Sequence, residues 1–286
     1  MLLEIIKSIF LGIVQGITEW LPVSSTGHMI LFDRLFTLNV PESFKNLFFV
    51  VIQLGSIIAV IFLYFNRLNP FNPRLSMQKK TSIYRLWLMI IIASIPAAFA
   101  MLADDTIDAL FYNPPCIAVA LIVYGVLFIW MENRSREPRI TSESQINYKI
   151  ALILGVFQLL AVIPGTSRSG AIILGATLIG FARPLAAEFT FYMAIPAMVG
   201  ASGFKILKFI ISDSAKDVVT DGMITSGFGQ FIILLFGFVT AFAVSFFVIR
   251  FLLNYIRKHD FKIFGYYRIG LGILIILVEL IGAIER

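Results

Sequence analysis

The sequence predicts an all-α polytopic membrane protein, with six transmembrane helices plus two re-entrant helical hairpins in an inverted-topology repeat. Hydrophobic residues make up 59% of the chain and charged residues 14%, against about 25% charged residues in soluble domains. Several apolar runs reach the roughly 20 residues that cross a bilayer as a helix. Two further apolar stretches are interrupted by proline, glycine and serine. These three observations together indicate the fold class.

Six apolar runs have the length of full spans within one integral membrane domain, residues 1–286. The predicted spans are residues 44–65, 83–103, 115–131, 186–211, 228–252 and 265–284. Their number and length exclude a soluble globular protein. The single cysteine, Cys116, falls in the third span, so no disulfide framework is expected.

The loops between the spans differ in charge, which predicts their sidedness. Residues 66–85, 132–149 and 253–264 are rich in Lys and Arg, as short cytoplasmic loops are. These loops account for the net charge of +6 without a nucleic-acid partner. Two other loops carry the acidic residues Asp104, Asp105, Asp108, Asp213, Asp217 and Asp221. We therefore expect the acidic loops and both chain termini to be extracytoplasmic.

Residues 1–36 and 150–181 are apolar but too interrupted to be simple spans. Each contains a break rich in Pro, Gly and Ser, which leaves halves too short to cross a bilayer alone. Irregular backbone at membrane depth is tolerated where it is buried in protein or lines a wet cavity. We interpret both stretches as re-entrant helical hairpins, the first entering from the outside and the second from the cytoplasm.

The two broken stretches have similar surroundings, which predicts an internal repeat of about 1–131 and 150–286. The matching residues are Gly12, Gln15 and Pro22 in the first stretch and Gly155, Gln158 and Pro164 in the second. Each repeat would hold one hairpin and three spans, and an odd number of spans inverts one repeat relative to the other. Inverted repeats with broken helices place a ligand site near the bilayer midplane, at the repeat interface.

The polar residues in the two breaks indicate a phosphate site. Ser and Thr after each break can cap the helix that resumes, and the first N–H groups of that helix attract anions. Arg168 adds a positive charge able to bind phosphate bidentately. The candidate phosphate-binding residues are Ser24, Thr26, Gly27, Thr166, Ser167, Arg168 and Ser169.

A carboxylate, a hydroxyl and an imidazole near the first break could carry the reaction. Gln15 and Glu19 are four residues apart and share a helix face. Together they could hold a divalent cation, Mg²⁺ or Ca²⁺, or Glu19 could act as a base. Ser25 or His28 could attack phosphorus, and the residues alone do not choose between them. The candidate catalytic residues are Glu19, Ser25, His28 and Arg168.

Other polar residues have a structural interpretation. Gln53 and Gln158 are interpreted as hydrogen-bonding links between helices. Glu188 is interpreted as a charge at the start of a helix, and His259 as a solvated residue in a basic loop. A role in helix packing competes equally with phosphate binding for three hydroxyl residues, Ser24, Thr166 and Ser169.

At these residues the chain resembles the undecaprenyl-diphosphatase family, bacterial membrane phosphatases linked to bacitracin resistance. Residues 15–28 read Gln-Gly-Ile-Thr-Glu-Trp-Leu-Pro-Val-Ser-Ser-Thr-Gly-His and resemble its motif (E/Q)xxxE followed by PVSSTGH. Residues 164–169 read Pro-Gly-Thr-Ser-Arg-Ser and resemble its PGxSRSxxT motif. The resemblance covers essentially the full length. It implies that Glu19, Ser25, His28 and Arg168 are catalytic or contact phosphate.

The resemblance implies hydrolysis of undecaprenyl diphosphate to undecaprenyl phosphate and inorganic phosphate. This reaction recycles the lipid carrier of cell-wall synthesis, confers bacitracin resistance and places the protein in the bacterial plasma membrane, among membrane lipids. Two residues depart from the motifs. Gln15 stands where many members have Glu, which leaves one carboxylate for a metal, and Ile172 stands where the second motif ends in Thr.

A transporter or flippase of the polyprenyl phosphate carrier is the competing expectation, because inverted repeats with broken helices are a transporter architecture. A flippase needs phosphate recognition but no nucleophile, so the candidate nucleophiles discriminate between the two functions. An ion channel or a structural membrane subunit is a third, weaker expectation. The sequence is compatible with a homodimer and fixes neither the oligomeric state nor the leaflet from which substrate arrives.

Overall fold

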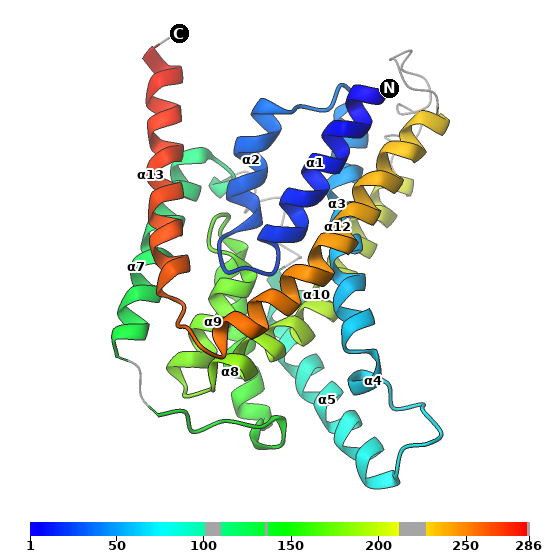
Figure 1. Ribbon diagram of the computed structural model, residues 1–286, viewed down its shortest axis with the longest axis vertical. Helices are drawn as coiled ribbons and strands as arrows, with labels where there is room; N and C mark the ends of the chain where they lie inside the picture. The colour runs from blue at the N-terminus through cyan, green and yellow to red at the C-terminus, as the bar shows by residue number, and fades with distance from the viewer. Residues whose placement is uncertain (101–109, 135–136, 212–226, 285–286) are drawn as a thin grey trace.

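The computed structural model describes residues 1–100, 110–134, 137–211 and 227–284, and helices dominate this part of the chain (Figure 1). Six of the helices described there are long and apolar enough to cross a bilayer. They are α3 (Glu42–Leu63), α5 (Met77–Ala100), α7 (Pro114–Asn133), α10 (Arg183–Ile211), α12 (Gly227–Ile256) and α13 (Lys262–Ile284). Each overlaps one of the six predicted spans, which confirms the all-helical membrane class.

The helix boundaries differ from the predicted spans at polar ends. α5 begins at Met77 instead of residue 83, because Gln and Lys favour helices although they are polar. α12 likewise continues to Ile256, beyond residue 252. The acidic residues that predict two outer loops, and residues 101–103 of the second predicted span, lie outside the described residues.

The two broken stretches each form a pair of short helices. α1 (Leu2–Thr18) and α2 (Ser25–Leu35) run in opposite directions, and the turn that joins them points toward the middle of the molecule (Figure 1). α8 (Tyr148–Leu159), the 3-10 turn η3 (Leu160–Val162) and α9 (Arg168–Leu178) form the second pair. A proline in each connection removes a backbone donor and ends the helix. Each connection therefore remains irregular while its flanking helices form.

Helices from the two halves of the chain pack against each other in matching pairs. α1 packs along α12, and α8 packs along α5. α3 contacts α12, and α10 contacts α5. Two further pairs join helices at equivalent positions of the two halves, α7 beside α13 and α3 beside α10. If each helix of one half is replaced by its equivalent in the other half, the contact of α1 with α12 becomes the contact of α8 with α5. In the same way, the contact of α3 with α12 becomes that of α10 with α5.

Close approach of backbones makes two of these contacts possible. A Cβ atom at Gly12 of α1 would lie 2.7 Å from the carbonyl oxygen of Gly237 in α12. A Cβ atom at Gly155 of α8 would likewise collide with the carbonyl oxygen of Ala93 and the ring of Pro96 in α5. Small residues at helix interfaces in membranes allow such approach. The two glycines matched in the sequence therefore have the same packing role.

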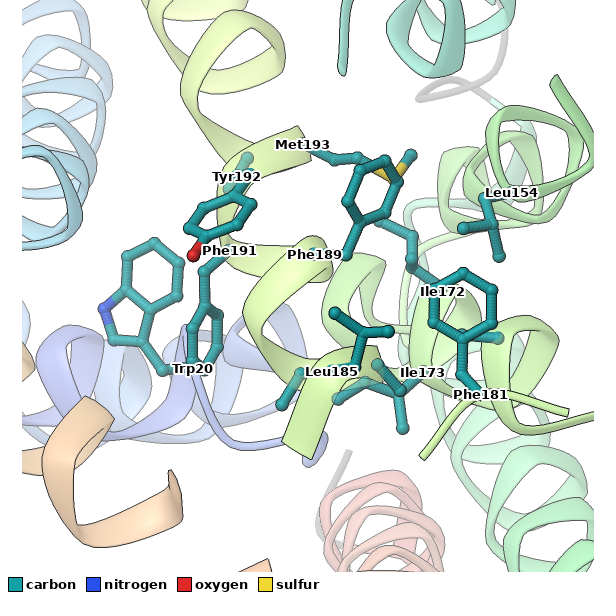
Figure 2. Packing of buried hydrophobic residues seen from close by; sticks show 14 of the residues in the cluster. Trp20, Leu154, Ile172, Ile173, Phe181, Leu185, Phe189, Phe191, Tyr192 and Met193 are labelled. Carbon is teal, nitrogen blue, oxygen red and sulfur yellow. The ribbon is translucent and has the colours of Figure 1, made fainter. Parts of the chain in front are cut away.

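The largest apolar cluster fixes the connection after α1 and one face of α9 (Figure 2). The Trp20 ring is fully buried and meets Phe191 of α10 edge to face, with 5.3 Å between centroids. Ile172 of α9 is also fully buried and shares this cluster with Leu154 and Phe181. The departure from the threonine of the family motif therefore adds apolar contact within the core.

Candidate active site

α2 and α9 each begin directly after a serine that caps the helix. The amide of Gly27 donates to Ser24 Oγ at 3.4 Å, and the amide of Gly170 donates to Ser167 Oγ at 3.2 Å. Both serines have positive φ, 71° and 69°, and they are the non-glycine residues with positive φ among those described. Such backbone costs roughly 1–3 kcal/mol per residue and concentrates at functional sites. The predicted caps are confirmed, and the two cap serines share one backbone conformation.

A partly buried ion pair joins the two turns across 149 residues of sequence. Arg168 Nη2 donates to Glu19 Oε1 at 2.8 Å, and Gln15 Nε2 donates to Glu19 Oε2 at 2.8 Å. Ser169 Oγ donates to the backbone carbonyl of Glu19 at 3.3 Å. Both carboxylate oxygens of Glu19 therefore accept hydrogen bonds, and the start of α9 lies against the end of α1.

A cavity of about 530 Å³ is lined by both turns. The predicted site residues that line it are Glu19, Ser25, Thr26, Ser167, Arg168 and Ser169. Much of the remaining wall is apolar and comes from α5 and α10. Two helix N-termini, an arginine and several hydroxyls form a site suited to a phosphate. The apolar wall is suited to the first part of a lipid chain.

Four other predicted residues do not line this cavity but contact the residues and helices around it. Gln15 holds Glu19, and Ser24 caps α2. A Cβ atom at Gly27 would lie 3.2 Å from Leu121, so this glycine faces α7. Thr166 is buried, and its backbone carbonyl oxygen accepts a hydrogen bond from α13. The hydroxyl of Ser24 therefore has a capping role, the observed bond of Thr166 is made by its backbone, and Ser169 both lines the cavity and links the turns.

His28 lies on a different side of the first turn. Its Nδ1 is 2.7 Å from the carbonyl oxygen of Ser24, and its Nε2 is 2.6 Å from the hydroxyl of Tyr267. In a neutral ring Nδ1 donates to the carbonyl, so Nε2 accepts the tyrosine proton. His28 lines a second, nearly apolar cavity of about 500 Å³ with side chains such as Phe10 and Phe32. Ser25 therefore shares the cavity of Arg168, and His28 does not.

Gln53 of α3 and Gln158 of α8 also line the Arg168 cavity. Gln158 is buried, and its Oε1 atom has no hydrogen-bond partner among the described residues. The interpretation as a hydrogen-bonding link between helices is therefore not supported at Gln158, because its carbonyl oxygen accepts no bond from another described residue. Glu188 lies outside the cavity and accepts a hydrogen bond from Arg67 at 3.0 Å, and His259 is exposed and stacks on Tyr255.

Arg268 of α13 is a functional candidate that the motifs do not include. Its side chain is fully buried and donates to backbone carbonyls of both turns. The sequence does hold a signal, because Arg268 falls within the predicted span 265–284. Ionisable residues at membrane depth are functional-site hypotheses by default.

The described residues contain no group of three or more His, Cys, Asp or Glu side chains placed to hold a metal ion. Glu19 is the carboxylate of the cavity, and its oxygens are bound to Arg168 and Gln15. Divalent cations in proteins take six or more oxygen ligands, often with several waters. This donor set does not fit a divalent cation by itself.

Comparison with known proteins gives full-length matches. Residues 8–274 match the family model described as bacitracin resistance protein BacA. The undecaprenyl-diphosphatase of Enterococcus faecalis is 51% identical over 284 residues, 98% of each chain. The undecaprenyl-diphosphatase 1 of Clostridioides difficile (strain 630) is 52% identical over 280 residues, 96% of each chain. The undecaprenyl-diphosphatase of Acetivibrio thermocellus is 52% identical over 279 residues, 96% of this chain and 98% of that one.

Proposed function

The chain belongs to the BacA family of bacitracin resistance proteins, and we propose that it hydrolyses undecaprenyl diphosphate to undecaprenyl phosphate and inorganic phosphate. The observation that carries the proposal is the cavity in which Ser25, Glu19 and Arg168 meet at two helix N-termini. A membrane phosphatase needs such a site for the headgroup beside an apolar path for the lipid. Full-length relatives named undecaprenyl-diphosphatase support the same substrate.

In this reaction Ser25 Oγ attacks the terminal phosphorus of the diphosphate. A P–O bond forms to Ser25, the bridging P–O bond breaks, and the lipid monophosphate leaves. Glu19 takes the serine proton, while Arg168 and the first amides of α2 and α9 stabilise the charge on the transferring group. Water then cleaves the phosphoserine and releases inorganic phosphate. Ser25 is preferred to His28 because it lines the cavity of Arg168.

The membrane arrangement in this proposal is an inverted repeat whose two short helix pairs are re-entrant hairpins. The exchange of packing partners between the halves supports it, as do the matched glycines and the matched cap serines. The start of α1 and the end of α13 lie at the same end of the molecule (Figure 1). We place both termini outside the cytoplasm, in the plasma membrane of a bacterium, because the basic loops predict this orientation.

We propose that a divalent cation binds only together with the diphosphate substrate. The protein offers Glu19 and Gln15, and the oxygens of a diphosphate could complete the coordination of Mg²⁺ or Ca²⁺. When bound, such an ion would neutralise charge on the diphosphate. The transfer of phosphate to Ser25 does not require the ion.

The direct test is phosphate release from a polyprenyl diphosphate by the purified protein in detergent, with and without a chelator. We expect release by the unmodified protein, with the monophosphate as lipid product. The chelator arm measures the contribution of a divalent cation separately. Absence of release under both conditions, from protein that is folded by its thermal transition, would exclude the phosphatase.

Transport of the lipid monophosphate is the second candidate, favoured by the exchanged packing of the two halves. Detergent abolishes compartments, so a transporter without hydrolytic activity would release no phosphate there. In vesicles, a Ser25→Ala variant separates the two functions. It should retain any transport, which needs phosphate recognition, and lose hydrolysis, which needs the hydroxyl.

A further inference from the structure

Arg268 is a buried cation without a carboxylate partner among the described residues. It lies in the second turn of α13, and its side chain is fully buried. The guanidinium lies over the ring of Tyr124 in α7, 5.3 Å from the centroid. Burying a charge in a membrane protein is costly, and such residues face the bundle interior and bind carbonyls or other charges. We therefore infer that Arg268 has a role beyond helix packing.

The partners of Arg268 are backbone carbonyls of both turns. Nη1 donates to Pro22 at 3.2 Å, and Nη2 donates to Gly165 at 2.9 Å and to Thr166 at 2.8 Å. Pro22 lies two residues before the cap of α2, and Thr166 lies directly before the cap of α9. One planar guanidinium thus joins the two segments that aim Ser25 and Arg168.

The carbonyls hold the guanidinium without cancelling its charge. Arg168 and Arg268 together bring two positive charges to the turns, and Glu19 brings one negative charge. The balance favours an anion in the cavity. Arg268 also lies against the first turn of α9, because a Cβ atom at Gly170 would be 3.0 Å from Nη1. Its charge therefore adds to that of the helix N-terminus.

We propose that Arg268 is a positioning residue, which fixes the two turns in register so that Ser25 and Arg168 act on the same phosphate. This inference rests on the proposed function. It does not require Arg268 to touch substrate. Misplacing reactive groups by about 1 Å can lower a rate about 100-fold. Loss of Arg268 should therefore affect kcat more than KM.

The kinetic test compares Arg268→Met and Arg268→Lys with the unmodified protein in detergent. We expect Arg268→Met to lower kcat by about 100-fold with KM within about threefold. Arg268→Lys keeps the charge but is a single point donor that cannot span both turns. We expect it to remain at least about tenfold below the unmodified protein. A kcat equal to that of the unmodified protein in either variant would overturn the proposal.

A matched control is Arg250→Met in α12. Arg250 is an exposed arginine stacked on Phe246, 4.2 Å from the ring centroid, and both turns lie on other elements. Its kcat should be that of the unmodified protein. A loss as large as in Arg268→Met would show that removing any intramembrane arginine has this effect, and would overturn the specific role of Arg268.

Amide hydrogen exchange tests the same proposal without catalysis. Exchange in peptides that cover residues 20–27 and 164–170 should rise together in Arg268→Lys, and remain unchanged in Arg250→Met. Arg268→Lys is the more conservative variant and keeps the measurement informative where Arg268→Met does not fold. Unchanged exchange in both turns would overturn the proposal even if the protein releases phosphate. If exchange rises in Arg268→Lys but the unmodified protein releases no phosphate, the link between the two turns through Arg268 is supported and the phosphatase activity is rejected.

Discussion

The two cap serines of the site have the same backbone conformation, but the residues that follow them differ in chemistry. Ser24 and Ser167 share an unusual positive φ, and each caps the helix that follows. The next residue is Ser25 in the first turn and Arg168 in the second, so the candidate nucleophile and the anion-binding residue occupy equivalent positions. The comparison shows two helix starts with the same cap conformation and different side chains, a hydroxyl at one and a guanidinium at the other.

A second contrast concerns the glutamines behind the turns. Gln15 of α1 donates to Glu19, which lies four residues later. Gln158 of α8 has Val162 at the corresponding position, and its Oε1 atom lacks a partner among the described residues. The carboxylate is thus present on one side of the site only. In the proposed reaction, this asymmetry assigns the chemical step to the first turn and phosphate binding to the second.

The largest effect is expected from Arg168→Ala. Arginines that stabilise a transferring phosphoryl group contribute about 10³–10⁵ to the rate, so kcat should fall at least about 1,000-fold. Arg168→Lys restores a point charge without a bidentate fork and should recover only part of the loss. Phosphate release in detergent measures both. Full activity in Arg168→Ala would remove the second turn from the chemistry.

Glu19→Gln and Glu132→Gln compare a buried carboxylate inside the site with one outside it. Glu132 is buried and accepts from Arg183 and from the amide of Phe261. Breaking a buried pair costs roughly 3–5 kcal/mol, so both variants should have lower thermal midpoints.

Only Glu19→Gln should also lower kcat, by at least about 100-fold, because it removes the base. The two measurements are made on the same preparation, with the assay run well below both thermal midpoints. Equal kcat values in the two variants would contradict the assignment of Glu19.

Gly12→Ala and Gly155→Ala test the structural equivalence of the halves. Each added methyl group would collide with a facing helix backbone, which should lower stability by about 1–3 kcal/mol. Gly270→Ala is the matched control, since no atom lies within 4 Å of its added Cβ. Thermal unfolding in detergent measures all three. A neutral result at one of the two tested glycines would show that the halves do not pack equivalently.

The smallest effects are expected at the glutamines. Gln15→Ala should lower kcat about tenfold, because a hydrogen bond to a charged group contributes roughly 1.5–3 kcal/mol. Gln158→Ala removes an amide without a comparable partner and should change kcat less than about threefold. The ratio of the two kcat values measures the asymmetry of the site. A larger loss of kcat in Gln158→Ala than in Gln15→Ala would contradict the assignment of the base to Glu19, beside Gln15.

Much of this arrangement could be predicted because its signals are local. Hydropathy predicts the six spans, and the hydroxyl residues after the second break predict that a helix resumes near Arg168, where α9 begins. The contact between Glu19 and Arg168 is not local. The residues are 149 positions apart, and the sequence predicts their contact only through the hypothesis of an inverted repeat that brings the two breaks together.

The positions of His28 and Arg268 could not be derived in the same way. His28 bonds to Tyr267, and that contact depends on how α2 docks against α13. Helix spacing within the first motif places His28 three residues after Ser25, but it does not say which face meets the cavity. Arg268 is visible as a charge inside an apolar span, yet only the fold shows that it reaches Pro22 and Gly165.

The most direct test of the account is to find where phosphate is attached during turnover. The protein is mixed with polyprenyl diphosphate, quenched within one turnover, and digested under conditions that preserve both phosphoserine and phosphohistidine. Mass spectrometry of the peptide that contains residues 24–28 then locates the group. We expect phosphate on Ser25 in the unmodified protein and none in Ser25→Ala, which should be inactive. Phosphate on His28, or full turnover by Ser25→Ala, would contradict it.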